Sequence, residues 1–378
     1  MHNSSLVSTF GTQYTKARVL AYYLPQFHPI PENDKWWGKG FTEWTNVGKA
    51  KPLFPGHYQP HVPADLGYYD LRVPETRQAQ ADLAREYGIE GFVYWHYWFG
   101  NGKRLLERPF NEVLASGQPD FPFALAWANE TWSGSFHGLK DGKVLIEQTY
   151  PGDEDYTAHF NTVLPAFRDH RYITCEGRPV FFVYHPHEVP DMGHFIDLWQ
   201  QLAIKNGLRG IYFVAIQQSL FTAEETNAAY KKMKSFGFAA INVINSYNAP
   251  IKDFKVKLMR KIFFKWLKLI PNLIPYRADM IDSCLDELID VMPTVMPNWD
   301  HTPRTGKRGV VLYGSTPDKF RESVHRMLIK IKHKPYDHRF LMVKSWNEWA
   351  EVNYLEPDLQ YGRQYLEALG SEILEDNE

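Results

Sequence analysis

Short apolar runs alternate along the chain with longer segments whose apolar positions recur at helical spacing. The longer segments predict helices over residues 74–87, 104–116, 153–167, 192–206, 223–234 and 317–332, and a glycine ends several of them. The apolar runs predict eight strands, at residues 18–24, 91–95, 123–128, 179–184, 211–215, 238–243, 293–296 and 340–345. Strands that alternate with helices favour a parallel sheet, and eight of them fit one (β/α)₈ TIM-type barrel with long loops.

A doubly wound open sheet would show the same alternation. No G-x-G-x-x-G segment follows the first strand, and no P-loop pattern occurs anywhere in the chain. The sequence therefore lacks the glycine-rich signatures of nucleotide-binding open sheets, and we predict the barrel.

The predicted domain organisation is a single barrel over residues 18–372, between a polar tail at 1–17 and an acidic tail at 373–378. An insertion at residues 247–290 interrupts the alternation between the sixth and seventh strands. Within it, residues 252–277 carry basic side chains on one side of a predicted helix and apolar and aromatic ones on the other. Such a helix can lie on an anionic membrane, or it can pack on the barrel with its lysines in solvent.

Composition narrows the functional classes. The formal net charge of −2 gives no overall field that would attract nucleic acid. Two cysteines exclude a disulfide framework, and with a polar N-terminus that lacks a signal peptide they indicate the cytoplasm. No apolar run is long enough to span a membrane. We expect no cofactor and no metal ion.

Polar and aromatic residues gather where the predicted strands end. Active sites of such barrels form at the C-terminal ends of the strands, so we expect several of these residues to contact a substrate. Each could instead pack at the exit of its strand. The candidates are Tyr23, His28, Tyr94, His96, Trp127, Asn129, Glu130 and Tyr184.

Two carboxylates stand between two indoles directly after the last predicted strand, in Trp346-Asn347-Glu348-Trp349-Ala350-Glu351. Paired carboxylates are what glycosidic-bond chemistry requires, and flat aromatic rings suit the apolar face of a sugar. The alternative is a solvated Glu pair above packed Trp residues. A similar segment contains Glu43 and Trp44 after the first strand, and in a closed barrel the two segments would lie side by side.

Other acidic and basic clusters have simpler explanations. Asp153 and Asp155 form a D-x-D pattern that many glycosyltransferases use to hold a metal and a nucleotide diphosphate. The pattern also opens a predicted helix, where acidic residues are favoured in any case. His185, His187 and Glu188 lack the spacing of a helical metal site. Asp300 can contact a substrate hydroxyl or order a loop.

The chain resembles the WbsX-type family of O-antigen-cluster proteins, whose domain is described as glycoside hydrolase family 99-like. The resemblance adds Trp37 and Trp299 as substrate-binding candidates, with Asn347 and Trp349 beside the carboxylates. The matching segments are residues 23–29, 36–47, 65–72, 127–130, 299–300, 302–304, 346–351 and 354–358.

The resemblance also implies a mechanism. Family 99 hydrolases are (β/α)₈ enzymes that cleave α-mannosidic bonds with retention, using a Glu-Trp-x-Glu motif that Glu348 and Glu351 match. By this likeness Glu348 would deprotonate the sugar 2-hydroxyl, and Glu351 would protonate the leaving oxygen.

The resulting hypothesis is a retaining glycoside hydrolase in cell-surface polysaccharide (O-antigen or lipopolysaccharide) metabolism. Its substrate would be an oligosaccharide or polysaccharide, with a lipid-linked glycan as one form. A glycosyltransferase and a non-catalytic glycan-binding barrel are the alternatives.

Overall fold

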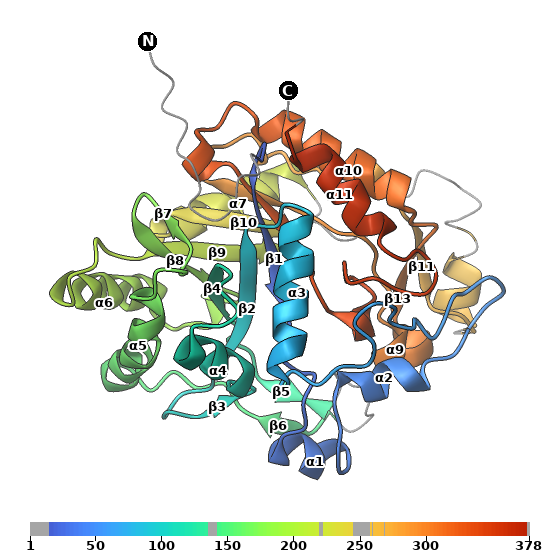
Figure 1. The fold of residues 1–378 in the computed structure, drawn as a ribbon, viewed down its shortest axis with the longest axis horizontal. Coiled ribbons are helices and arrows are strands. Elements are labelled where there is room, and N and C mark those ends of the chain that lie inside the picture. Colours follow the sequence, from blue (N-terminus) through green and yellow to red (C-terminus); the bar gives the residue numbers. More distant parts are fainter. Residues whose placement is uncertain are drawn as a thin grey trace.

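Eight parallel strands close into a barrel in the computed structural model, which describes residues 15–134, 142–218, 222–244, 258, 260–267 and 269–375 (Figure 1). β1 pairs with both β2 and β14, which closes the sheet. The prediction of a (β/α)₈ barrel and of all eight strands is therefore confirmed. The barrel strands are β1 (Arg18–Tyr23), β2 (Gly91–Trp98), β4 (Phe123–Trp127), β8 (Arg178–Val183), β9 (Tyr212–Gln218), β10 (Ala240–Ile244), β12 (Val291–Val295) and β14 (Phe340–Val343).

Helices between the strands form the outer layer, as the patterning predicts. In Figure 1, α3 lies across β1 and β2, and α10 packs against α11. The main helices are α3 (Pro74–Glu86), α4 (Arg108–Ser116), α5 (Asp153–Phe167), α6 (Met192–Lys205), α7 (Ala223–Ser235), α10 (Pro317–Ile331) and α11 (Gln364–Ile373). The helix predicted from residue 104 begins later, because β3 (Arg104–Leu105) pairs antiparallel with the end of β2.

The long loops carry short elements that the patterning did not predict. The helices are α1 (Pro31–Trp37), α2 (Glu43–Lys49) and α9 (Thr302–Thr305). The strands are β5 (Trp132–Ser133), β6 (Val144–Ile146), β7 (Thr174–Cys175), β11 (Asn272–Pro275) and β13 (Val310–Tyr313). The 3₁₀ turns are η2 (Pro186–Glu188), η4 (Ala278–Ile281), η5 (Gly306–Arg308), η6 (Tyr336–His338) and η7 (Trp349–Glu351).

Successive side chains of each barrel strand point alternately into the barrel and toward the helices. Tyr22 points inward, where its hydroxyl donates to Oδ1 of Asn242 at 2.7 Å. Its neighbour Tyr23 points outward and donates to Gln80 on α3 at 2.7 Å. This alternation decides which aromatic residues at the strand ends can reach the mouth of the barrel.

The predicted insertion lies partly outside the described residues, which resume fully at 269 after isolated stretches at 258 and 260–267. The described part contains a π-helical segment, η3 (Arg260–Trp266), and then β11, which pairs with β13. A helix that continues to residue 277 is therefore wrong. Pro271 and Pro275 explain the break, because proline cannot donate the helical hydrogen bond.

The barrel also includes residues that we assigned to the tails. The amide of Lys16 donates to the carbonyl of Ile373 at 2.8 Å, and Ala17 and Ile373 are buried. Residues 1–14 and 376–378 lie outside the described part. Across the described chain, every helix is too short or too polar to cross a lipid bilayer.

Candidate active site

The segment that follows β14 crosses the mouth of the barrel and is held there by buried hydrogen bonds. Oδ1 of Asn347 accepts the amide of Leu24 at 2.7 Å, and its Nδ2 donates to the carbonyl of Leu24 at 3.1 Å. The amide of Glu348 donates to Oγ of Ser345 at 3.1 Å. These bonds join the ends of the first and last strands, and they fix the backbone from which Glu348 and Glu351 project.

Glu348 and Glu351 line one cavity of about 160 Å³ at the C-terminal ends of the strands. Six of the seventeen residues that line it are aromatic, and β5 and β6 contribute part of the wall. The lining residues are Leu24, Gln26, Trp37, Trp95, Tyr97, Ala128, Glu130, Trp132, Ser133, Leu145, Tyr184, Ile244, Trp299, Arg304, Lys344, Glu348 and Glu351. Aromatic walls with a few charged groups at the base suit a sugar ring.

The carboxyl group of Glu348 is favoured in its protonated form. Its Oε1 accepts the indole N–H of Trp95 at 3.1 Å, and the ammonium of Lys344 lies 3.6 Å away. Burial and the nearby charge of Glu351 outweigh these contacts and raise the pKa of Glu348 to about 7.

The carboxyl group of Glu351 is favoured in its ionised form. Nη1 of Arg304 lies 2.5 Å from its Oε1, and Lys344 Nζ lies 3.7 Å from its Oε2. Asn353 adds a hydrogen bond of 3.2 Å. Burial opposes ionisation, but the charges of Arg304 and Lys344 hold the pKa of Glu351 well below its usual value.

The pair therefore offers one carboxyl that keeps its proton near neutral pH and one carboxylate that can accept a proton. Environments that separate the pKa values of two neighbouring carboxyls in this way are what acid–base chemistry at a glycosidic bond requires. In the free protein the separation is the reverse of the roles that the family resemblance implies.

The structure brings four of the predicted substrate-binding residues to the cavity: Trp37, Glu130, Tyr184 and Trp299. The ring of Tyr184 packs edge-on against Trp95, with the ring centroids 5.4 Å apart. Oε2 of Glu130 lies 3.5 Å from Nε2 of His185.

Four other candidates do not line this cavity, because they occupy outward-facing positions of their strands. Tyr23 contacts α3, and Tyr94 packs against Phe110 of α4. The rings of His96 and Trp127 both pack against His159 of α5. Each is buried between the sheet and the helices.

Three more candidates, Glu43, Trp44 and Trp349, lie in α2 and η7, which contact each other, and do not line the cavity. Glu43 is fully buried and its Oε2 lies 3.3 Å from Nε of Arg304. The indole of Trp349 donates to Oε2 of Glu356 at 2.5 Å. The ring centroids of Trp44 and Trp349 lie 5.5 Å apart. The two similar segments after the first and last strands therefore do lie side by side.

Two further candidates, Asn129 and His28, lie in the segments that follow β4 and β1. The side chain of Asn129 bonds to both the amide and the carbonyl of His185, at 2.8 Å each. His28 is buried, and burial lowers its pKa to about 4.

Asp300 is also buried away from the cavity. It accepts hydrogen bonds from Gln59 at 2.6 Å and the amide of Thr302 at 2.8 Å, and it contacts His57 at 2.7 Å. It faces a second cavity of about 230 Å³. These contacts agree with the interpretation that Asp300 orders a loop.

Sequence reasoning missed several residues of the cavity, notably Gln26, Trp95, Tyr97, Trp132, Arg304 and Lys344. Trp95 and Tyr97 alternate with Tyr94 and His96 along β2. Choosing the residues that reach the cavity therefore required knowing which side chains of β2 point into the barrel.

The D-x-D pattern forms the first turn of α5, with Gly152 rather than Asp153 at the N-cap. Asp153 contacts His194 at 2.7 Å, and Asp155 accepts the indole N–H of Trp98 at 3.0 Å. Both acidic side chains therefore have protein partners.

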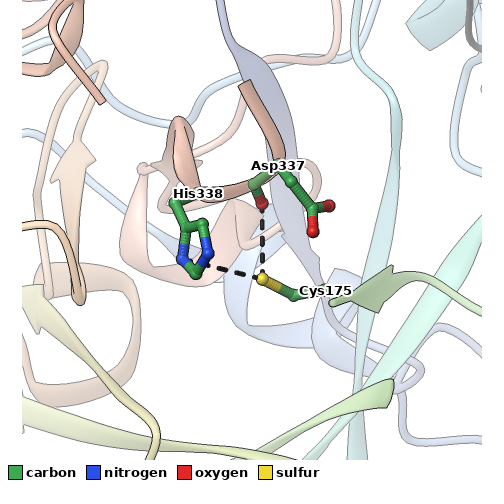
Figure 2. Close-up of side chains that lie close together, drawn as sticks. All are labelled: Cys175, Asp337 and His338. Carbon is green, nitrogen blue, oxygen red and sulfur yellow. Dashed lines mark hydrogen bonds between the residues drawn. The ribbon is translucent and has the colours of Figure 1, made fainter. Parts of the chain in front are cut away.

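A cluster with metal-ligand chemistry lies at the opposite end of the barrel, before β8 and β14. Figure 2 shows Cys175, Asp337 and His338, whose ligand atoms lie within 4.8 Å of one another. The thiol of Cys175 donates to the Asp337 carbonyl at 3.4 Å, and Arg18 pairs with the Asp337 carboxylate at 2.8 Å. Burial raises the pKa of the Cys175 thiol to about 12. The Cys175 thiol and the Asp337 carboxylate therefore both have protein partners in this structure.

A family model described as "Glycosyltransferase WbsX" matches residues 19–369. Two curated proteins, each named "Uncharacterized protein WxcX", come from Xanthomonas campestris pv. campestris strains B100 and ATCC 33913. Each is 37% identical over 361 residues, which cover 93% of this chain and 49% of the relative. The chain thus spans about half the length of the curated relatives it matches.

Solved structures share the fold. A glycoside hydrolase-like protein superimposes with a TM-score of 0.59 at 14% identity, over 99% of this chain and 98% of that one. The GH99 endo-alpha-mannosidase from Bacteroides thetaiotaomicron gives a TM-score of 0.55 at 12% identity, over 94% and 95%. At this identity the likeness establishes the barrel architecture.

Proposed function

The chain belongs to the WbsX family, and from this premise we propose that it is a carbohydrate-active enzyme that acts on glycosidic bonds in polysaccharide metabolism. The observation that carries the proposal is the pair Glu348 and Glu351. Both are almost fully buried in one aromatic cavity, and their surroundings favour opposite protonation states.

A retaining hydrolase is the reaction class that this geometry supports best. A sugar ring that stacks on the aromatic wall would place its glycosidic bond above the pair. One carboxyl gives its proton to the leaving oxygen, and the other accepts the proton of the sugar 2-hydroxyl, whose oxygen attacks the anomeric carbon. Water then attacks the anomeric carbon and gives a proton to the first carboxylate, while the second carboxyl returns its proton to the 2-oxygen.

A glycosyltransferase that uses the same pair is the second candidate, and the family description favours it. In that reaction an acceptor sugar takes the place of water. A non-catalytic glycan-binding barrel is the third, but a binding protein has no need of two carboxyls with separated pKa values.

Product analysis separates these candidates. The protein is incubated with the lipid-linked glycan and the surface polysaccharide of its source cell, with and without nucleotide sugars, and the products are analysed by NMR. New reducing ends without nucleotide sugars support hydrolysis. Extension of the glycan only when nucleotide sugars are present moves the assignment to transfer. Glycan binding without turnover in either condition rejects the enzyme and leaves the binding barrel.

Contact with an anionic membrane would bring such an enzyme to lipid-linked glycans. Leu258, Phe263, Leu267 and Leu269 are exposed within the described part of the insertion, which supports this proposal. Co-sedimentation with phosphatidylglycerol vesicles tests it. Leu267→Asp should weaken binding, whereas Ile329→Asp on α10, at a similarly exposed position, should not. Equal binding by both variants rejects the membrane contact.

A further inference from the structure

We propose that the second cavity, about 230 Å³ in volume, is a binding site for a neutral sugar unit, separate from the cavity that holds Glu348 and Glu351. It is formed by β13 and by the loops that follow β1, β12 and β14. This inference goes beyond the proposed function, because it requires a glycan ligand but no reaction at the carboxyl pair.

The second cavity adjoins the first across two chain segments that contribute to the walls of both. Trp299 and Glu351 line the first cavity, whereas their neighbours Asp300 and Val352 line the second. The amide of Asp300 donates to the carbonyl of Glu351 at 2.8 Å, which joins the two segments. The second cavity is the larger, at about 230 Å³ against about 160 Å³, so its volume suffices for a ligand unit that the first can hold. When two units of one polysaccharide occupy neighbouring sites, each raises the effective concentration of the other.

Aromatic rings form much of the wall of the second cavity. Tyr58 is 37% exposed, and its ring packs edge-on against His61 with the ring centroids 4.6 Å apart. An aromatic ring that remains partly exposed in a cavity offers a flat apolar surface to one face of a sugar ring. The aromatic lining residues are Phe54, Tyr58, Tyr313, Tyr354, Tyr361 and Tyr365.

A chain of buried hydrogen bonds orients His61 in this wall. The hydroxyl of Tyr354 donates to Oδ2 of Asp358 at 2.7 Å, so it accepts the hydrogen bond from Nδ1 of His61 at 2.5 Å. In the uncharged ring, Nε2 of His61 is then an acceptor, and it has no hydrogen-bond partner among the residues that the structure describes. The wall therefore presents an acceptor whose ring is held in place by the protein.

Two amide side chains add donors to the same wall. Oδ1 of Asn298 accepts the backbone amide of Trp299 at 2.9 Å, and its Nδ2 has no partner within the described part of the chain. The exposed side chain of Gln360 likewise has none there, since only its backbone amide is bonded, to Asp358. A sugar hydroxyl both donates and accepts, so it can pair with the acceptor on His61 and with these donors.

The charge of the second cavity disfavours anionic ligands. Asp300 and Asp358 line it, and none of the described residues in its wall is Lys or Arg. Burial opposes ionisation of Asp300, but hydrogen bonds, first that with His57, hold its pKa below the usual value. Burial also opposes ionisation of Asp358, whose pKa is lowered by its contact with His61. Two carboxylates without a lysine or arginine repel a uronate or a nucleotide diphosphate, so a neutral sugar fits better than either.

Methyl groups allow the two cavities to be followed separately by NMR. Val311, Leu312 and Val352 line the second cavity, and Leu24 and Leu145 line the first. The protein is labelled with ¹³C at its Leu and Val methyl groups and titrated with glucose, galactose, mannose, N-acetylglucosamine or a partial hydrolysate of the surface polysaccharide of its source cell. We expect at least one of these probes to shift the resonances of all three residues of the second cavity. Glucuronate should leave these three resonances unchanged.

Variants at exposed positions assign the shifts to the second cavity. Tyr58→Ala removes an aromatic ring and Gln360→Ala removes a hydrogen-bonding side chain, and we expect each to raise the Kd for the sugar about threefold to tenfold. Gln364→Ala, exposed on α11 and outside the cavity, is the matched control for Gln360→Ala and should bind as the wild type does. Glu348→Gln should also keep the shifts, because binding in the second cavity needs no reaction.

Shifts confined to the two residues of the first cavity would overturn the inference. So would unchanged resonances of the second cavity with every probe, or shifts by glucuronate as large as those by a neutral sugar. Unchanged affinity in folded Tyr58→Ala and Gln360→Ala would also reject it. If Tyr58→Ala does not fold, Gln360→Ala still decides. Binding in the second cavity without turnover of any glycan would support this inference and reject the proposed function, so the two can fail separately.

Discussion

The indole nitrogen of Trp95 lies 3.1 Å from Oε1 of Glu348, which joins the second strand of the barrel to the carboxylate that follows the last strand. Trp95 can make this contact because it points into the barrel. Trp127, on the neighbouring strand β4, points outward, and its indole donates to the carbonyl of Trp98 at 2.9 Å. The two tryptophans therefore form a matched pair for testing which face of the strands serves the substrate.

We predict that Trp95→Phe lowers kcat/KM for the glycan by about twofold to tenfold, because a hydrogen bond to a neutral carboxyl contributes about 0.5–1.5 kcal/mol. Its unfolding free energy should change little. Trp127→Phe should instead lower the unfolding free energy by about 1–3 kcal/mol and leave kcat/KM unchanged. Steady-state kinetics and denaturant unfolding measure both. A loss of turnover in Trp127→Phe equal to that in Trp95→Phe would mean that the assignment of strand faces is wrong.

Activity should depend on pH through the carboxyl pair. Burial and the charge of Glu351 raise the pKa of Glu348 to about 7, so the carboxyl pair loses its proton as the pH rises through 7 and kcat/KM should fall. The pKa of Glu351 is held below its usual value, so the ionised form persists well into acid and the profile should stay flat down to about pH 4.5. A profile that rises through pH 7 would contradict a need for that proton in turnover, provided that circular dichroism shows a folded protein at each pH.

The two cysteines should differ in reactivity. Cys175 is buried and its pKa is raised to about 12, whereas Cys284 is exposed. We expect iodoacetamide at neutral pH to modify Cys284 and to leave Cys175 unmodified until the protein unfolds. Mass spectrometry of peptides identifies the modified residue. Rapid labelling of Cys175 in the native protein would show that the cluster of Cys175, Asp337 and His338 in Figure 2 is accessible to solvent.

Removal of the side-chain amide of Asn347 should weaken the connection between the first and last strands of the barrel. The side chain bonds to both backbone groups of Leu24, and Asn347→Ala leaves them buried without partners. We predict a loss of about 1–3 kcal/mol in unfolding free energy. Asn206→Ala, at the C-cap of α6, removes a side-chain amide that bonds to Leu202 of its own helix and, at 3.4 Å, to the exposed Arg168, and is the control. Equal small losses in both variants would argue against a strand-closing role for Asn347.

The strands could be predicted because apolar runs and helical periodicity alternate regularly in the sequence. Which side chains of each strand point into the barrel could not be predicted. All eight residues of β2 are buried, since the strand lies between a packed interior and a helical layer. No alternation of polar and apolar positions was left to separate Trp95 and Tyr97 from Tyr94 and His96.

Contacts between segments that are far apart in the chain also could not be predicted from the sequence. Arg304 and Glu43 are 261 residues apart, and only the folded chain shows that they share an ion pair. The pair Glu348 and Glu351 was accessible because three-residue spacing directly after the last strand placed both carboxylates at the mouth. The ion pair between Arg304 and Glu351 depends on the folded chain, so it could not be derived from that spacing.

The most direct test of the central claim compares glycan turnover by the wild type, Glu348→Gln, Glu351→Gln and Glu154→Gln. Glu154 is exposed in the first turn of α5 and provides the matched control. We predict that the two cavity variants fold but lose about a hundredfold to ten-thousandfold in turnover, the contribution expected of a general acid or base. Glu154→Gln should match the wild type. Full turnover by folded Glu348→Gln and Glu351→Gln would contradict the proposal that this pair acts on the glycosidic bond.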